Sequence, residues 1–129
     1  MCGAARYAFT GEPEIILNCH CTDCQKASGG QFATIIALRA EHFTSEGELT
    51  FYDWRGSSGT LLRRGFCPKC GTTVFGYPPN PNVRNIWAGT LDDGDWVVPT
   101  LDHWLKSRKP WSVPLDTTEK WKDAFLYSQ

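Results

Sequence analysis

The sequence predicts a single domain over residues 1–129, built mainly of antiparallel β-strands. Short runs of aliphatic, aromatic and β-branched residues alternate with turn-forming clusters of Gly, Pro, Asn, Asp and Ser along the whole chain. Two Cys-x-x-Cys motifs, Cys21–Cys24 and Cys67–Cys70, each follow a predicted strand, and such a motif supplies two sulfur ligands from one loop. Only one stretch, near the C-terminus, carries a clear helix signal.

The first half of the chain contains four predicted strands, over residues 4–9, 14–18, 32–38 and 49–54. The stretch from Phe32 to Leu38 is short, apolar and β-branched at its centre, so we expect it to be a central strand buried on both faces. A single helical turn is expected after Cys24, through Ala27, where Ser28-Gly29-Gly30 ends it. Residues 41–48 are polar and predict a turn.

In the second half, residues 60–66 and 72–77 predict two strands on either side of Cys67-Pro68-Lys69-Cys70, a hairpin clipped by metal. Residues 83–91 predict another strand. Pro99 lies inside the apolar stretch 96–105, which is therefore expected to be an edge strand or an extended segment. Asp116-Thr117-Thr118-Glu119 resembles a capping box, and Trp121 and Phe125 share a helical face, so a short C-terminal helix is expected.

Composition and charge narrow the classes of function. Apolar residues make up 41% of the chain, and the formal net charge is −1. A nucleic-acid or membrane-surface partner would normally require a larger basic patch, so neither partner is expected. The longest apolar run is far shorter than a membrane span, and no basic segment precedes an apolar stretch at the N-terminus. We therefore expect a cytoplasmic protein, in which clustered thiols serve as metal ligands or redox groups.

The six cysteines can be divided into zinc sites in two ways. In the first division, one closed four-thiolate site contains Cys21, Cys24, Cys67 and Cys70. The 42 residues between these two pairs exceed the zinc-ribbon spacing of about 15–20. In the second division there are two sites, one formed by Cys19, Cys21 and Cys24 and the other by Cys2, Cys67 and Cys70. The spacing leaves both divisions open, with one or two Zn²⁺ ions per chain.

A site with three thiolates has a distinct chemistry. Three protein ligands leave the fourth position of zinc open, as in catalytic or ligand-exchanging sites. Three thiolates around one divalent ion also give a centre with net negative charge, which suits one more soft sulfur ligand better than an activated water. A thiol or a thiol adduct is therefore the substrate class that such a site favours.

Several motifs run in order over nearly the whole chain: Cys2-Gly3-Ala4-Ala5-Arg6-Tyr7, Cys19-His20-Cys21-x-x-Cys24, Ala27-Ser28-Gly29, Phe66-Cys67-x-x-Cys70-Gly71, Gly89-Thr90-Leu91-Asp92-Asp93 and Pro110-Trp111. Together they resemble the glutathione-dependent formaldehyde-activating enzyme family. The resemblance implies a β-tent fold, in which several coiled antiparallel sheets are pinned by zinc. It also implies a carbon–sulfur lyase or synthase that acts on an adduct such as S-hydroxymethylglutathione, with glutathione or a similar small thiol as partner.

The resemblance also implies roles for the cysteines. Cys19, Cys21 and Cys24 correspond to the exchangeable, catalytic-type site, and Cys67 and Cys70 belong to the structural site. The family pattern opens with Cys-x-Cys-Gly, of which this sequence contains only the second cysteine, Cys2. The structural site is thus expected to contain Cys2, Cys67 and Cys70, with its fourth ligand unassigned.

Beyond the cysteines, two histidines and two arginines are candidates. His20, between two expected ligands, and His103, followed by an aromatic residue, are candidate catalytic residues that could carry a proton. Asp102 and His103 are neighbours on a predicted strand, so they face opposite ways and do not form a dyad. Arg63 or Arg64 could bind a substrate carboxylate.

Two other classes of function remain as alternatives. One is a non-catalytic zinc-bound β module that binds proteins. The other is a thiol redox enzyme, similar to methionine sulfoxide reductases of related fold, that would use Cys19 or Cys21 as nucleophile. A redox enzyme needs a cysteine free of metal, whereas the cluster of three favours keeping all of them bound.

Overall fold

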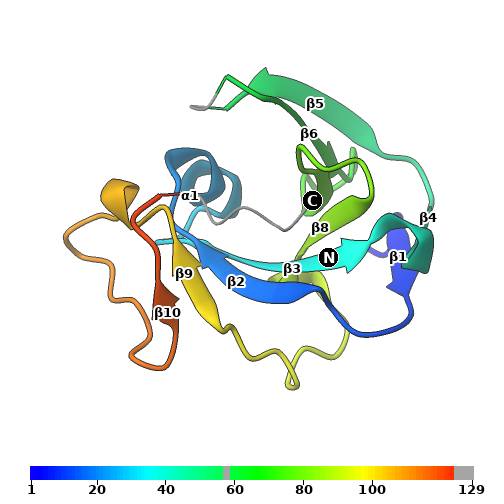
Figure 1. The fold of residues 1–129 in the computed structure, drawn as a ribbon. Coiled ribbons are helices and arrows are strands. Elements are labelled where there is room, and N and C mark those ends of the chain that lie inside the picture. The colour runs from blue at the N-terminus through cyan, green and yellow to red at the C-terminus, as the bar shows by residue number, and fades with distance from the viewer. Residues whose placement is uncertain (57–58, 124–129) are drawn as a thin grey trace.

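The computed structural model describes residues 1–56 and 59–123, and their structure is mainly β. Its strands form two sheets (Figure 1). A small two-stranded sheet pairs β1 (Arg6–Phe9) with β4 (Phe43–Glu46) in antiparallel fashion. The eight-stranded sheet has the order β10-β9-β2-β3-β8-β7-β6-β5. Its strands are β2 (Ile15–Cys19), β3 (Ala33–Arg39), β5 (Thr50–Arg55), β6 (Leu61–Phe66), β7 (Thr73–Tyr77), β8 (Val83–Trp87), β9 (Leu101–His103) and β10 (Glu119–Lys120).

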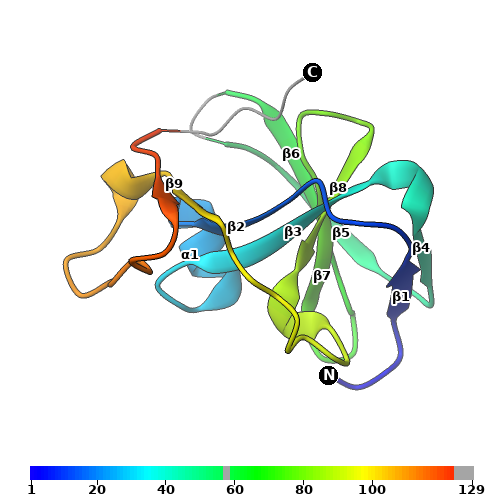
Figure 2. The ribbon, with the colours of Figure 1, turned by 60° about the horizontal axis from the view of Figure 1, so that its bottom comes forward.

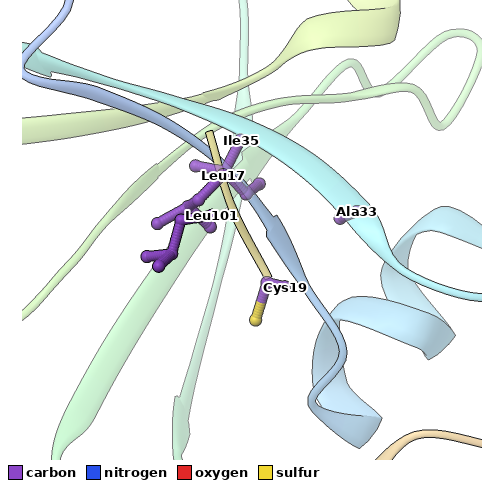
Figure 3. Close-up of a cluster of buried hydrophobic side chains, with 5 residues drawn as sticks. All are labelled: Leu17, Cys19, Ala33, Ile35 and Leu101. Atoms are coloured by element: carbon purple, nitrogen blue, oxygen red, sulfur yellow. The ribbon is translucent and has the colours of Figure 1, made fainter. Parts of the chain in front are cut away.

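The strand β3 lies in the middle of the large sheet, between β2 and β8, and is buried on both faces. On one face, Ile35 belongs to a cluster with Leu17 of β2 and Leu101 of β9 (Figure 3). On the other face, Ile36 and Leu38 belong to a second cluster with Val74, Phe75 and Ile86. Each of these large side chains contributes about 1.5–3 kcal/mol through burial. The prediction of a central strand over residues 32–38 is confirmed.

The pairing of the sheet is antiparallel from β2 through β5, as expected, but becomes parallel at its other end. There β9 inserts between β2 and β10 and runs parallel to both (Figures 1 and 2). The strand begins at Leu101, two residues after Pro99, so the missing N–H of that proline removes no ladder hydrogen bond. Residues 101–103 are therefore an inner strand, whereas the sequence predicted an edge strand or an extended segment over residues 96–105.

The expected C-terminal helix is wrong over residues 116–123. Glu119 and Lys120 form β10 instead, because backbone N–H groups of this segment donate hydrogen bonds to carbonyl groups at and just before β9. The N–H of Glu119 donates to the carbonyl of Thr100 at 2.9 Å, and that of Trp121 donates to the carbonyl of Asp102 at 2.8 Å. The side chain of Thr118 donates to the Asp102 carboxylate instead of capping a helix. Phe125, the other residue of the expected helical face, lies outside the described residues.

Three smaller differences concern element bounds. The helix α1 (Thr22–Ser28) begins before Cys24 and has seven residues rather than one turn. Residues 43–46, expected to be a turn, form β4 after the short 3₁₀ helix η1 (Ala40–His42). The strand expected over 83–91 ends at Trp87, where the 3₁₀ helix η2 (Ala88–Thr90) follows; a third 3₁₀ helix, η3, spans Leu105–Ser107. Among the described residues, no helix is long and apolar enough to cross a membrane.

Candidate metal centres

The structure brings the cysteines together in two separate triads. One contains Cys19, Cys21 and Cys24, and the other contains Cys2, Cys67 and Cys70. Within each triad the sulfur atoms lie within 4.8 Å of one another, and all six thiols are free. The two Cys-x-x-Cys motifs thus belong to different groups. Three thiolate sulfurs at this spacing could hold one metal ion, and zinc is the ion that such a donor set suits.

The first triad is built where β2 meets α1. Cys19 is the last residue of β2 and is buried, and its side chain belongs to the hydrophobic cluster of Figure 3. Cys21 is the N-cap residue of α1, and its Sγ accepts a hydrogen bond from the backbone N–H of Cys24 at 3.3 Å. The helix ends at Ser28, and its C-cap residue Gly29 has a φ of 69°, a left-handed conformation that glycine adopts readily. A strand end and one helical turn therefore suffice to converge three sulfurs.

The thiols of this triad differ in acidity because they share protons. Hydrogen bonds from Cys19 and Cys24 lower the pKa of Cys21. The hydrogen bond with Cys21 raises the pKa of Cys19. Hydrogen bonds with Cys19 and then with Cys21 raise the pKa of Cys24. Cys21 is therefore the most acidic of the three thiols. A soft cation that replaces those protons would find three converging sulfur donors.

His20 lies between two triad cysteines, and its ring is fully buried. Its Nε2 lies 2.7 Å from Oδ1 of Asp102 on β9. Asp102, also fully buried, accepts a further hydrogen bond from Thr118 and lies 3.3 Å from Nζ of Lys120. The backbone carbonyl of His20 accepts from Nε2 of Gln25 at 2.6 Å. These contacts fix the backbone that carries Cys19 and Cys21.

His103 lies on the same side of the sheet as Cys19. The two residues are partners in the parallel register of β2 and β9, so their side chains project from the same face. Burial lowers the pKa of His103 to about 4, although the charge of the nearby Cys21 acts in the opposite direction. The imidazole is therefore neutral at pH 7. The predicted separation of Asp102 from His103 holds, since Asp102 contacts His20 instead.

The structure distinguishes between the two candidate arginines. Arg63 donates to both carboxylate oxygens of Asp53, at 2.6 and 2.8 Å. The guanidinium of Arg64 lies over the ring of Trp54 at 5.4 Å and near that of Tyr52 at 6.0 Å. Nε1 of Trp54 donates to Oδ2 of Asp23 at 3.0 Å, and Asp23 lies between Cys21 and Cys24 on α1. Arg64 thus contacts Trp54, and Trp54 contacts a residue of α1 that lies in sequence between two cysteines of the first triad.

The second triad joins the N-terminal segment to the turn between β6 and β7. The turn is closed by the N–H of Gly71, which donates to the carbonyl of Cys67 at 2.8 Å, and Gly71 has a φ of 73°. The sulfurs of Cys2 and Cys67 lie 3.6 Å apart. Two sulfurs on one tetrahedral zinc, at about 2.3 Å from it, would be roughly 3.8 Å apart, so the spacing fits such an ion. A hydrogen bond from the Thr72 side chain lowers the pKa of Cys70 to about 6.

The second triad borders a cleft of about 530 Å³, a volume in the range of small-molecule sites. Sequence reasoning did not predict this cleft. Its wall includes Arg6 and Tyr7 of β1, together with residues 90–93. Arg6 donates to Asp92, and the hydroxyl groups of Tyr7 and Thr90 lie 2.8 Å apart. These contacts join segments more than 80 residues apart, for which the sequence offers no local signal.

Comparison with known proteins gives a family and a fold. A family model described as glutathione-dependent formaldehyde-activating enzyme matches residues 1–107. No curated protein matches the chain. A crystal structure of a Rhodobacter sphaeroides protein, a structural genomics target, is similar in fold, with a TM-score of 0.56 and 20% identity. The similarity covers 70% of this chain and 83% of that one.

Proposed function

Since the chain belongs to the glutathione-dependent formaldehyde-activating enzyme family, we propose that it is a zinc-dependent carbon–sulfur lyase or synthase whose active site is the triad of Cys19, Cys21 and Cys24. Its substrate would be a thiol adduct of the S-hydroxymethylglutathione type. The observation that carries the proposal is the convergence of three thiols, one of them with a lowered pKa, beside a neutral imidazole.

The donor set of this triad fits zinc. Cys19, Cys21 and Cys24 would hold the ion, and their sulfurs already lie within 4.8 Å of one another without one. When bound, zinc would supply a coordination position at which a substrate sulfur is stabilised as its thiolate. The hydrogen bond from the Cys24 N–H to Sγ of Cys21 orients one of the three ligands and offsets part of its charge.

The reaction is an addition and its reverse. In the synthetic direction the thiol loses its proton, its sulfur forms a bond to the carbonyl carbon of formaldehyde, and the C=O π pair moves to the oxygen. The proton returns to that oxygen, so the product is RS–CH₂–OH. In the lyase direction the C–S bond breaks and the same proton moves back to sulfur. No oxidant or reductant is needed.

The chain's own residues would move the proton and hold the site. His103 would accept the thiol proton and return it to the oxygen, because burial keeps its imidazole neutral at pH 7. His20, buried against Asp102, would act as a positioning residue for the loop between Cys19 and Cys21. Arg64 would bind a substrate carboxylate, since the carboxylate of Asp53 already occupies Arg63.

The proposal can be tested by exchange NMR with ¹³C-formaldehyde and glutathione, which form the adduct slowly without catalyst. The zinc-loaded protein should accelerate the exchange between free formaldehyde and adduct, and Cys21→Ser should abolish the acceleration. Val98→Thr, at an exposed position outside the triad, is the matched control and should retain it. An exchange rate in the zinc-loaded protein equal to that of buffer would overturn the proposal and favour a binding role.

A further inference from the structure

Trp104 has a backbone conformation that a bulky side chain disfavours. It follows His103, the last residue of β9, and its φ of 58° and ψ of 35° lie in the left-handed region. Among the described residues it is the only one other than glycine with a positive φ. Glycine or asparagine would make the same turn at lower cost, because a large side chain crowds the backbone there. Such conformations are concentrated at catalytic and ligand-binding sites, where the side chain that they present is used.

The left-handed turn brings the indole of Trp104 to the side of the sheet on which the first triad lies. If β9 continued, His103 and Trp104 would project to opposite sides. Instead, the ring of Trp104 packs against the buried cluster that contains Cys19, as do Cys21 and Cys24. His103 projects from the same side, because it is the register partner of Cys19. Two consecutive side chains therefore both face the triad side of the sheet.

Hydrogen bonds hold the segment around Trp104 against the loop and the helix that carry the cysteines. The N–H of His20 donates to the carbonyl of His103 at 3.0 Å. Nε2 of Gln25 donates to the carbonyl groups of His20 and Ser107, at 2.6 and 3.1 Å. The carbonyl of Trp104 accepts from the N–H of Ser107 at 3.0 Å. Trp104 thus lies between two points of contact with residues 20–25, a segment that contains two cysteines of the triad.

Under the proposed function, on which this inference rests, the two ends of the substrate extend in different directions from the triad. The carboxylate of the thiol would bind at Arg64 on β6, whereas the carbonyl oxygen would face His103 on β9. In the strand order, β6 and β9 lie on opposite sides of β2, whose last residue is Cys19. The carbonyl carbon, with any group attached to it, would therefore lie on the β9 side, next to Trp104.

We propose that Trp104 is a specificity-determining residue that restricts the carbonyl partner of the reaction to formaldehyde. Its indole would occupy the space that the alkyl group of a larger aldehyde needs. The ring is only partly buried, so part of its surface is open to contact with a ligand. A bulky side chain at this strained position thus has a use that the turn itself does not supply.

The test compares exchange NMR of glutathione with ¹³C-formaldehyde and with ¹³C-acetaldehyde, which undergoes the same addition but carries one extra methyl group. The zinc-loaded wild type is compared with Trp104→Ala and with Trp104→Gly, in which glycine suits the left-handed φ. Trp96→Ala is the matched control, because it removes an indole that pairs with Phe9, a residue packed against the other buried cluster. Urea unfolding of each variant is measured in parallel.

The wild type should accelerate exchange with formaldehyde much more than exchange with acetaldehyde. Both Trp104 variants should raise the ratio of the acetaldehyde rate to the formaldehyde rate at least about tenfold, the discrimination that a single methylene-sized group commonly gives. Trp96→Ala should leave this ratio unchanged. A purely structural role of Trp104 would lower both rates together and would not move the ratio.

A second measurement needs no turnover. Calorimetric titration with S-methylglutathione and S-propylglutathione, two stable thioethers, compares ligands that differ only in the alkyl group on sulfur. The wild type should bind the methyl compound more tightly, and both Trp104 variants should reduce this preference at least about tenfold.

Equal acceleration of both aldehydes by the wild type would overturn the inference without any variant. An unchanged rate ratio or an unchanged binding preference in the Trp104 variants would also overturn it, and the proposed function would still stand if the wild type accelerates exchange with formaldehyde. A wild type that accelerates neither exchange would overturn the proposed function and, with it, the role of Trp104.

Discussion

Nε2 of His20 lies 2.7 Å from Oδ1 of Asp102, and both side chains are completely buried. The contact joins the residue between two triad cysteines to β9, and so connects the first triad to the C-terminal part of the sheet. Because Asp102 also contacts Thr118 and Lys120, one carboxylate joins two distant parts of the chain, the segment at His20 and the segment 118–120.

Asp102→Ala is expected to lower the free energy of unfolding by about 3–5 kcal/mol, because the buried side chains of His20 and Thr118 both lose their hydrogen-bond partner, at about 1–3 kcal/mol each. Asp102→Asn keeps an acceptor for His20 and should cost less, about 1–2 kcal/mol. Urea unfolding of the zinc-loaded proteins measures both values. Equal stability of Asp102→Ala and wild type would show that the buried network contributes nothing.

The carboxylate of Asp102 should make the free energy of unfolding depend on pH. Burial would by itself raise the pKa of Asp102, but hydrogen bonds from Thr118, His20 and Lys120 outweigh it, so the pKa lies below its ordinary value. A depressed folded-state pKa stabilises the fold above the unfolded-state value, near 4, and this contribution is lost as pH falls through the folded-state pKa. The stability difference between wild type and Asp102→Asn should therefore be constant from pH 7 to 5 and shrink below pH 4. A difference that grows on acidification would contradict this sign.

The two triads predict two zinc ions per chain. Cys67→Ser and Cys21→Ser should each reduce the zinc content from two ions to one, as measured by elemental analysis with protein quantification. A chelator should lower the melting temperature of wild type by at least about 10 °C, because bound metal contributes several kcal/mol to folding. One ion in wild type that either substitution removes completely would instead indicate a shared site.

Arg64→Ala should weaken binding of glutathione to the zinc-loaded protein by about fivefold, which corresponds to roughly 1 kcal/mol. This effect is expected because the guanidinium of Arg64 lies over Trp54, whose indole contacts Asp23, a residue between Cys21 and Cys24. Arg63→Ala, which removes the neighbour already paired with Asp53, serves as the control and should leave the affinity unchanged. Calorimetric titration gives both affinities, and a larger loss for Arg63→Ala would reverse the assignment.

Gly47 is expected to be important for the N-terminal segment that carries Cys2. It has a φ of 85°, and a Cβ at this position would clash with the carbonyl oxygen of Ala4. Gly47→Ala should lower the free energy of unfolding by about 2–3 kcal/mol through both strain and clash. At Gly11, with a φ of 74°, a Cβ would meet only ordinary contacts with His42, so Gly11→Ala should cost about 1 kcal/mol. Similar losses at both positions would show that the clash is relieved.

Local patterns in the sequence were sufficient to predict several strands of the large sheet. The apolar, β-branched run that contains Ile35 and Ile36 predicted the central strand, since such a run can only be buried on both faces. The Cys-x-x-Cys turn with Gly71 predicted the hairpin of β6 and β7, because its chemistry is contained in a few consecutive residues.

Features that depend on distant partners were not predictable in this way. The capping pattern at residues 116–119 favours a helix in isolation, but the carbonyl of Thr100 takes the N–H of Glu119 and turns the segment into a strand. The contact of His20 with Asp102 spans 82 positions, and that of Arg6 with Asp92 spans 86. No periodicity in either segment indicates its partner.

The two triads differ in how much chain must exist before each can form. Cys19, Cys21 and Cys24 lie within one short segment, whereas Cys2 and Cys67 are 65 positions apart, and the buried partner of His20 arrives only with β9. A growing polypeptide emerges from the ribosome N-terminus first. The first set of sulfurs is thus exposed long before the second set is complete, and before the last strands can cover its backbone. Translation would therefore order in time the uptake of ions by the two triads, and the first triad would be open to any competing soft metal in the interval.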